Sequence, residues 1–177
     1  TGDEDTAIVV TLSATDDGAE SLIATIERLP NAGVLYQYSA TGLGNAIRSV
    51  PTTITDGEMR VVYVPAENAN GSPLDSFEFA VSDQERASPP ATVIINVRPV
   101  NDAPVAVAEL SSANLLSSNG NEYVVLARDD RATLVTLDGS LSRDVESDPL
   151  EYEWSEGRGI RPIGTTALAT IRARTGG

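Results

Sequence analysis

The stretch Val97-Arg98-Pro99-Val100-Asn101-Asp102-Ala103-Pro104-Val105 decides how this chain is organised. Two prolines, five positions apart, enclose an Asn-Asp pair directly after a run of strand-like residues. Proline has no backbone N–H to donate, holds its own φ at about −65°, and biases the residue before it towards extended backbone. We therefore expect residues 97–105 to form a stiff linker between two β-domains, residues 1–102 and residues 103–177.

The size and composition of the chain agree with two small domains. It has 177 residues, so each domain holds roughly 75 to 100, close to the lower end for a domain that folds alone. Hydrophobic residues make up 41% of the chain, but aromatic residues make up only 5%. The two cores must therefore be filled mainly by valine, isoleucine, leucine and threonine.

Several residue types that carry chemistry are missing. The chain has no cysteine and no histidine, and all twelve of its cationic residues are arginine. Disulfides, thiolate or imidazole metal sites, serine–histidine catalysis and lysine Schiff bases are therefore excluded within this chain. Because secreted eukaryotic domains of this size usually carry disulfides, we expect an exported bacterial protein.

The net charge of −14 bears on the partners of the chain. It disfavours nucleic acid and anionic membranes, and it favours cation binding or a medium of high salt. An acidic, solvated surface is the alternative explanation for many individual carboxylates. No apolar run approaches the roughly 20 residues of a membrane span, and we expect no membrane insertion. The start at Thr1-Gly2-Asp3, without a signal segment, suggests an excised or processed fragment.

The first half shows the period-two alternation of half-buried strands. Strands are predicted at residues 8–14, 21–29, 33–38, 60–64, 77–82 and 93–97. Residues 41–56 lack a sustained period, so we expect a loop with at most one short edge strand. Short strands about ten residues apart, with no amphipathic helix, are typical of an antiparallel sandwich.

The second half is less regular. Strands are predicted at residues 122–127, 132–137 and 165–173, and residues 111–121 are expected to be a polar connection. The clearest alternation places Leu150, Tyr152 and Trp154 on one face. Because such alternation predicts burial, we expect Trp154 to anchor a core and not to serve as a carbohydrate platform.

Two family resemblances follow from short motifs. In the first half these are Glu4-Asp5-Thr6, Leu12-Ser13-Ala14-Thr15-Asp16-Asp17-Gly18, Tyr63-Val64-Pro65, Asp75-Ser76-Phe77, Val81-Ser82-Asp83 and Val100-Asn101-Asp102-Ala103-Pro104-Val105. Their order and spacing resemble the cadherin-like tandem repeats of large bacterial surface proteins. The resemblance implies an immunoglobulin-like sandwich, repeated in series, often with calcium at the junctions.

In the second half, Val135-Thr136-Leu137-Asp138-Gly139-Ser140 followed by residues 142–154 resembles the PKD (polycystic kidney disease) domain, another β-sandwich of cell-surface proteins. Together the two resemblances imply an all-β chain of two immunoglobulin-like antiparallel β-sandwich domains in tandem. By the same comparison, the first strand of the first domain and the last strands of the second are expected to be missing.

A first candidate metal site comes from the cadherin-like resemblance. Asp16, Asp17 and Asp83 match calcium-ligand positions of such repeats and would share the pole of the first domain that lies away from the linker. The family usually spaces its carboxylates Asp-x-Asp, whereas Asp16 and Asp17 are adjacent. The acidic pair at residues 129–130 lies between two arginines and is interpreted as a charged turn.

A second candidate metal site lies at the linker. Asp144, Glu146 and Asp148 alternate by two, so in an extended loop their carboxylates would face the same way. Asn101 and Asp102 would complete the site with further oxygen ligands, which calcium prefers. The alternative is an ordinary acidic turn, with Asp102 capping the linker backbone through hydrogen bonds.

These patterns favour a binding or structural role over catalysis. Paired carboxylates of a glycosidase need an aromatic-lined cleft, and this chain has only eight aromatic residues, scattered on strands. We expect a non-enzymatic, calcium-stabilised spacer or adhesion segment of a large exported bacterial protein, secreted or on the cell surface. Its partners would be neighbouring repeats of the same polypeptide, a cell-surface protein or a polysaccharide. One alternative is a polysaccharide-binding accessory module of a secreted degradative enzyme, and another is a homotypic adhesive surface.

Overall fold

The structure is a computed structural model that describes residues 1–16, 21–83, 85–112, 115–119, 122–125, 133–156 and 161–173. Over these ranges the regular elements are all β-strands, as predicted, and no helix is long and apolar enough to cross a membrane. The chain divides into two compact units, Thr1–Val100 (unit 1) and Asn101–Gly177 (unit 2). The division falls inside the linker, residues 97–105.

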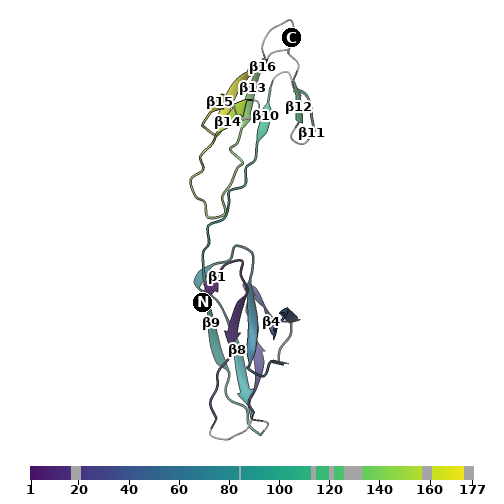
Figure 1. Cartoon of the computed structure of the whole chain (residues 1–177), viewed down its shortest axis with the longest axis vertical. Helices are drawn as coiled ribbons and strands as arrows, with labels where there is room; N and C mark the ends of the chain where they lie inside the picture. The colour runs from purple at the N-terminus through teal and green to yellow at the C-terminus, as the bar shows by residue number, and fades with distance from the viewer. Residues whose placement is uncertain are drawn as a thin grey trace. The chain divides into compact units, whose positions relative to one another are not determined.

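Unit 1 contains two sheets (Figure 1). The five-stranded sheet has the order β1-β9-β8-β3-β6, and the four-stranded sheet has the order β2-β7-β4-β5. The strands are β1 (Gly2–Asp3), β2 (Ile8–Thr11), β3 (Ile23–Arg28), β4 (Gly33–Ser39), β5 (Gly42–Ile47), β6 (Thr52–Thr53), β7 (Arg60–Pro65), β8 (Gly71–Ser82) and β9 (Ala91–Arg98). All pairings are antiparallel except that of β1 with β9.

The inward rows of both sheets meet in one hydrophobic core. The five-stranded sheet contributes Ile26 and Phe77, and the four-stranded sheet contributes Leu35 and Tyr63, all of them fully buried. Alternate residues of a strand point to opposite faces, so the period-two pattern placed these side chains on the same side. The predicted β-sandwich is confirmed for unit 1.

Two features of unit 1 differ from the sequence-based expectation. Residues 41–56 contain two strands, β5 and β6, and not one short edge strand. The glycines of β5 hide its pattern, and Gly44 is needed there because a Cβ would lie 2.6 Å from the carbonyl oxygen of Gln37. In addition, β1 precedes the first predicted strand and pairs with the end of β9.

Unit 2 is built from smaller sheets (Figure 1). Its strands are β10 (Glu109–Ser111), β11 (Leu115–Asn119), β12 (Glu122–Val125), β13 (Thr133–Asp138), β14 (Trp154–Glu156), β15 (Arg161–Gly164) and β16 (Leu168–Ala173). They form a three-stranded sheet, β10-β13-β16, and two pairs, β11-β12 and β14-β15. The predicted polar connection at residues 111–121 contains β11, so that expectation is wrong.

The core of unit 2 is small among the side chains that the structure describes. Val135 and Ala169 are its buried hydrophobic residues, and Thr133 is a buried polar one. Trp154 is only half-buried, so it is less buried than predicted for a side chain that anchors a core. Residues 150–153 alternate as predicted but belong to no strand, and in the described part of unit 2 the pairing of this segment begins only at Trp154.

Candidate functional site

The first residues of unit 2 meet a loop of the same unit through carboxylates. The backbone N–H of Asp102 donates a hydrogen bond to Oε2 of Glu146, 3.3 Å away. Oδ2 of Asp102 is buried and has no hydrogen-bond partner in the part of the chain that the structure describes. Asn101 is exposed and its amide donates to the carbonyl oxygen of Asp102 at 3.0 Å. Of the predicted linker site, the structure therefore brings Asp102 and Glu146 together.

The acidic loop itself is a turn. Oδ1 of Asp144 accepts hydrogen bonds from the backbone N–H groups of Glu146, at 3.0 Å, and Asp148, at 3.1 Å. Ser147 has a φ of 65°, in the left-handed region. The premise of an extended loop with three parallel carboxylates is therefore wrong. Asp148 is exposed, and Asp144 acts here as the acceptor that folds the loop.

This arrangement limits what the cluster can bind. Within the described ranges, no group of three or more acidic side chains is placed to hold a metal ion. A hard cation takes six to eight oxygens, so Asp102 and Glu146 would need help from carbonyl oxygens and water. The unpartnered Oδ2 of Asp102 does suit a cation, because a buried carboxylate oxygen without a donor is costly. The residues therefore fit a weak cation site better than a tight one.

The other candidate acidic residues lie apart from the linker. Oδ1 of Asp83 accepts the backbone N–H groups of Arg86, at 2.7 Å, and Glu85, at 2.9 Å. These bonds, that from Arg86 most strongly, lower the pKa of Asp83. Asp16 is exposed, while Asp17 and the pair at residues 129–130 lie outside the described residues. Asp83 thus has a structural role in its own turn, and its metal role stays a prediction.

Glu4 is a carboxylate that the sequence did not single out as a site. It is 2% exposed, and its two oxygens accept separate hydrogen bonds: Oε1 from the backbone N–H of Val100 at 2.6 Å and Oε2 from the amide of Asn70 at 2.9 Å. The only signal was its place in the motif Glu4-Asp5-Thr6. Glu4 fixes the last residue of unit 1 to that unit.

A second such carboxylate, Asp75, organises the interior of unit 1. It accepts hydrogen bonds from the backbone N–H groups of Asn31 and Ala32 and from the hydroxyl of Tyr63, the last at 3.2 Å. Burial, together with the negative charge of Asp75, raises the pKa of the Tyr63 hydroxyl. This contact joins the Tyr63 and Asp75 motifs in the folded unit.

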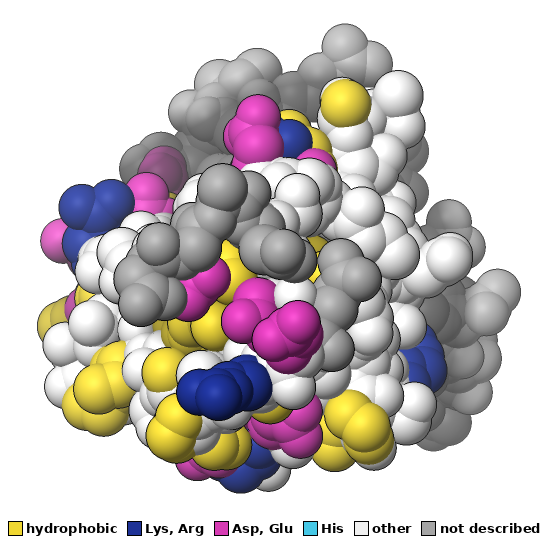
Figure 2. Space-filling model, turned by 90° about the horizontal axis from the view of Figure 1, so that it is seen from below, with side chains coloured by type: hydrophobic (Ala, Val, Ile, Leu, Met, Phe, Trp, Pro, Cys, Tyr) yellow, Lys and Arg dark blue, Asp and Glu magenta, His cyan; other side chains and the backbone are white. Residues whose placement is uncertain are grey.

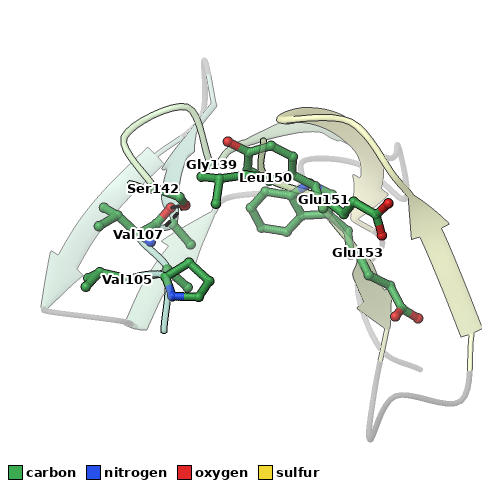
Figure 3. A pocket seen from close by; sticks show the side chains of 12 residues that line it. Val105, Val107, Gly139, Ser142, Leu150, Glu151 and Glu153 are labelled. Carbon is green, nitrogen blue, oxygen red and sulfur yellow. Dashed lines mark hydrogen bonds between the residues drawn. The ribbon is translucent and has the colours of Figure 1, made fainter. Parts of the chain in front are cut away.

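Unit 2 also contains a groove, which we call the unit 2 groove (Figure 3). Its volume is about 610 Å³, and it is lined by residues 104–108, Gly139, Ser142 and residues 150–154. Figure 3 shows Val105, Val107 and Ser142 on one wall and Leu150 on the other, while the carboxylates of Glu151 and Glu153 point away from the first wall. The groove is therefore mostly apolar inside and acidic along one outer side.

Figure 2 shows one face of the molecule, on which charges of both signs are mixed. On the face shown in Figure 2, acidic side chains lie among hydrophobic and arginine side chains and are not gathered into one patch. Several arginines are paired, including Arg28 with Glu78 at 3.0 Å and Arg98 with Asp3 at 2.7 Å. Exposed pairs of this kind contribute little to stability. The surface ion pairs therefore do not indicate a functional site, and the contacts at the linker and the unit 2 groove are the better candidates.

Comparison with known proteins gives one match. The family model of the SibA-like, immunoglobulin-like domain matches residues 3–97, which is more than half of the chain. No curated protein and no solved structure matches. The match covers the sandwich of unit 1 and agrees with the immunoglobulin-like fold that both resemblances implied, while their cadherin-like and PKD specifics stay predictions. The chain belongs to the SibA-like immunoglobulin-like domain family.

Proposed function

We propose that this chain is a non-enzymatic spacer or adhesion segment of an exported bacterial surface protein, and that calcium bound by Asp102 and Glu146 stabilises its second unit. One observation carries this role: the buried Oδ2 of Asp102 has no hydrogen-bond partner among the described residues, and the same residue contacts Glu146. A cation would neutralise both carboxylates. With a net charge of −14, the chain also attracts cations over a longer range.

The expected affinity is low. Two carboxylates with carbonyl oxygens and water form a site of few charges, and calcium sites of extracellular modules have dissociation constants on the order of 10⁻⁴–10⁻³ M. At a concentration ten times the dissociation constant, the free energy of unfolding rises by about 1.4 kcal/mol. Such a site would be occupied outside cells and would help to keep the start of unit 2 ordered.

The spacer role is supported by how the linker residues are held. In unit 1 the buried Glu4 holds the N–H of Val100, and in unit 2 Glu146 holds the N–H of Asp102. Pro99 and Pro104 restrict the backbone on either side. Each unit thus fixes its own end of a short linker, which suits a segment that joins neighbouring repeats of one polypeptide.

Thermal unfolding tests the calcium site. We expect 10 mM calcium to raise the melting temperature of unit 2 relative to chelator, and Asp102→Asn to abolish the increase. Asp148→Asn is the matched control, because it makes the same charge change at an exposed carboxylate of the loop that contains Glu146. Equal responses of the two variants to calcium, or no response of the parent chain, would contradict the assignment.

A further inference from the structure

One wall of the unit 2 groove has the pattern of a strand but no partner strand within the described ranges. Leu150 and Tyr152 are half-buried, whereas Glu151 and Glu153 are exposed, which is the alternation of a strand that covers a core. The segment leads directly into β14, which pairs only with β15 among the described strands. No backbone hydrogen bond joins residues 150–153 to any other described residue. We refer to residues 150–153 as the free edge.

The opposite wall is different, because its backbone is already bonded. Val105 exchanges two backbone hydrogen bonds with Arg143, at 2.8 and 3.1 Å. The N–H of Val107 donates to Oγ of Ser142 at 3.0 Å, and that hydroxyl donates back to the carbonyl oxygen of Val107 at 3.1 Å. An added strand would therefore find, along the free edge, backbone groups that have no partner among the described residues, and apolar side chains on the opposite wall.

We infer that the unit 2 groove binds an extended peptide strand in which apolar residues alternate with basic residues. The backbone of the peptide would pair with the free edge and extend the β14–β15 sheet, since one strand offers N–H and C=O groups at the spacing that another requires. Its apolar side chains would enter the groove between Val107 and Leu150. Its basic side chains would lie on the outer side, beside Glu151 and Glu153.

The groove chemistry favours a peptide over a glycan. A sugar needs several polar partners, but the hydroxyl of Ser142 is already used both as donor and as acceptor by Val107. The carboxylates of Glu151 and Glu153 point away from the opposite wall, so they do not reach into the groove (Figure 3). The backbone groups of the free edge also run along a line, as a strand partner needs, and not around a ring.

The charge of the free edge also disfavours a second copy of this chain as the occupant. Two free edges paired with each other would bring Glu151 and Glu153 of both copies together, and like charges on neighbouring strands destabilise a sheet. Each copy carries a net charge of −14. A strand with lysine or arginine at alternate positions would instead place opposite charges beside these two residues.

Trp154 provides the readout, because it is the only tryptophan and lines the groove. Its fluorescence should change saturably on titration of the full chain with a peptide of about seven residues that alternates valine and lysine. The same peptide with N-methyl groups on the backbone nitrogens that face the free edge should not bind. A peptide with glutamate in place of lysine should bind more weakly. The titrations should give the same result with calcium and with chelator, which separates this site from the proposed cation site.

Charge variants locate the site. Glu153→Lys should weaken binding of the lysine peptide about two- to fivefold, the range expected for one exposed ion pair, and should strengthen binding of the glutamate peptide. Glu109→Lys is the matched control: it makes the same charge change at an exposed residue of β10 and should leave both affinities unchanged. Because both positions are exposed, neither variant should affect folding.

Four results would overturn the assignment. One is the absence of saturable peptide binding, and another is equal binding of the N-methylated peptide. The third is a response of Trp154 to cellohexaose or chitohexaose but not to the lysine peptide, which would indicate a glycan site. The fourth is dimerisation of the chain that the lysine peptide does not reverse but that Glu153→Lys enhances, which would indicate a second copy as the occupant.

Discussion

The two units use the same kind of strand pattern with different results. In unit 1 the inward rows of two sheets meet, and Tyr63 and Phe77 are completely buried. In unit 2 an equally regular row of Leu150, Tyr152 and Trp154 stays half-buried beside a groove. Alternation therefore predicts which side chains point inward, but it does not predict whether another strand covers them. Unit 1 is thus a closed sandwich, and we expect the stability of unit 2 to depend on what it binds.

The largest expected effect comes from a substitution in the core of unit 1, which should destabilise that unit and leave unit 2 unchanged. Phe77→Ala removes a fully buried ring from unit 1 and should cost about 3–5 kcal/mol of its free energy of unfolding. The transition of unit 2, followed by Trp154 fluorescence, should not move. Ile94→Ala, on the neighbouring strand and 61% exposed, should change stability by less than about 0.5 kcal/mol. A shift of the Trp154 transition in Phe77→Ala would show that the core of unit 1 also stabilises unit 2, contrary to the contrast drawn between the units.

Close packing in unit 1 can be tested with a pair of glycines. A Cβ at Gly33 would lie 2.5 Å from the ring carbon Cζ of Tyr63 and from the carbonyl oxygen of Val64, whereas a Cβ at Gly57 would meet nothing within 4 Å. Gly33→Ala should therefore destabilise unit 1 by about 1–3 kcal/mol in denaturant unfolding. Gly57→Ala should leave it unchanged within about 0.5 kcal/mol. Equal effects of the two substitutions would argue against a tightly packed sandwich.

Replacing the carboxylates that hold the linker residues should have a smaller effect, which amide hydrogen exchange can measure. The N–H of Val100 lies 2.6 Å from Glu4, while that of Asp102 lies 3.3 Å from Glu146, so Val100 should exchange more slowly. Glu4→Ala should speed exchange at Val100 and lower the stability of unit 1 by about 1 kcal/mol. Exchange at Asp102 should respond to Glu146→Ala instead. Slower exchange at Asp102 than at Val100, without added calcium, would contradict this ranking.

The smallest effect is a pH dependence confined to unit 1. Hydrogen bonds from the guanidinium of Arg60 to Asp56, at 2.8 and 2.9 Å, lower the pKa of that carboxyl from 3.8 to about 2. A lowered folded-state pKa adds stability above pH 3.8 that is lost as the pH falls through about 2. Asp56→Asn should reduce the loss of stability of unit 1 between these pH values. A parallel change in unit 2 would show that the effect is not local.

Much of the fold could be predicted from the sequence because burial enforces alternation in paired strands. The rows through Ile26, Phe77 and Ile95 are buried as predicted. The strands that were not predicted lack this alternation. Gly42 and Gly44 interrupt the pattern of β5, and β11 is rich in serine. Among the strands that the structure describes, β5 pairs only with β4 and β11 only with β12.

The candidate site was less predictable because turns break the assumption of extended backbone. The spacing of Asp144, Glu146 and Asp148 is that of one strand face, but two backbone N–H groups bind Oδ1 of Asp144 and fold the loop. Glu4 gave no signal beyond its place in the motif Glu4-Asp5-Thr6, since it belongs to no alternating row of residues. Its role depends on Asn70 and Val100, which are far from it in sequence.

Thermal unfolding with two probes, in calcium and in chelator, tests most directly whether the units differ in this way. Trp154 fluorescence reports unit 2, and calorimetry reports both units. We expect two transitions, with the Trp154 transition at the lower temperature and alone in moving upward when calcium is added. A single transition seen by both probes, or a calcium response shared equally by the two units, would contradict the account of a self-contained unit 1 and a ligand-dependent unit 2.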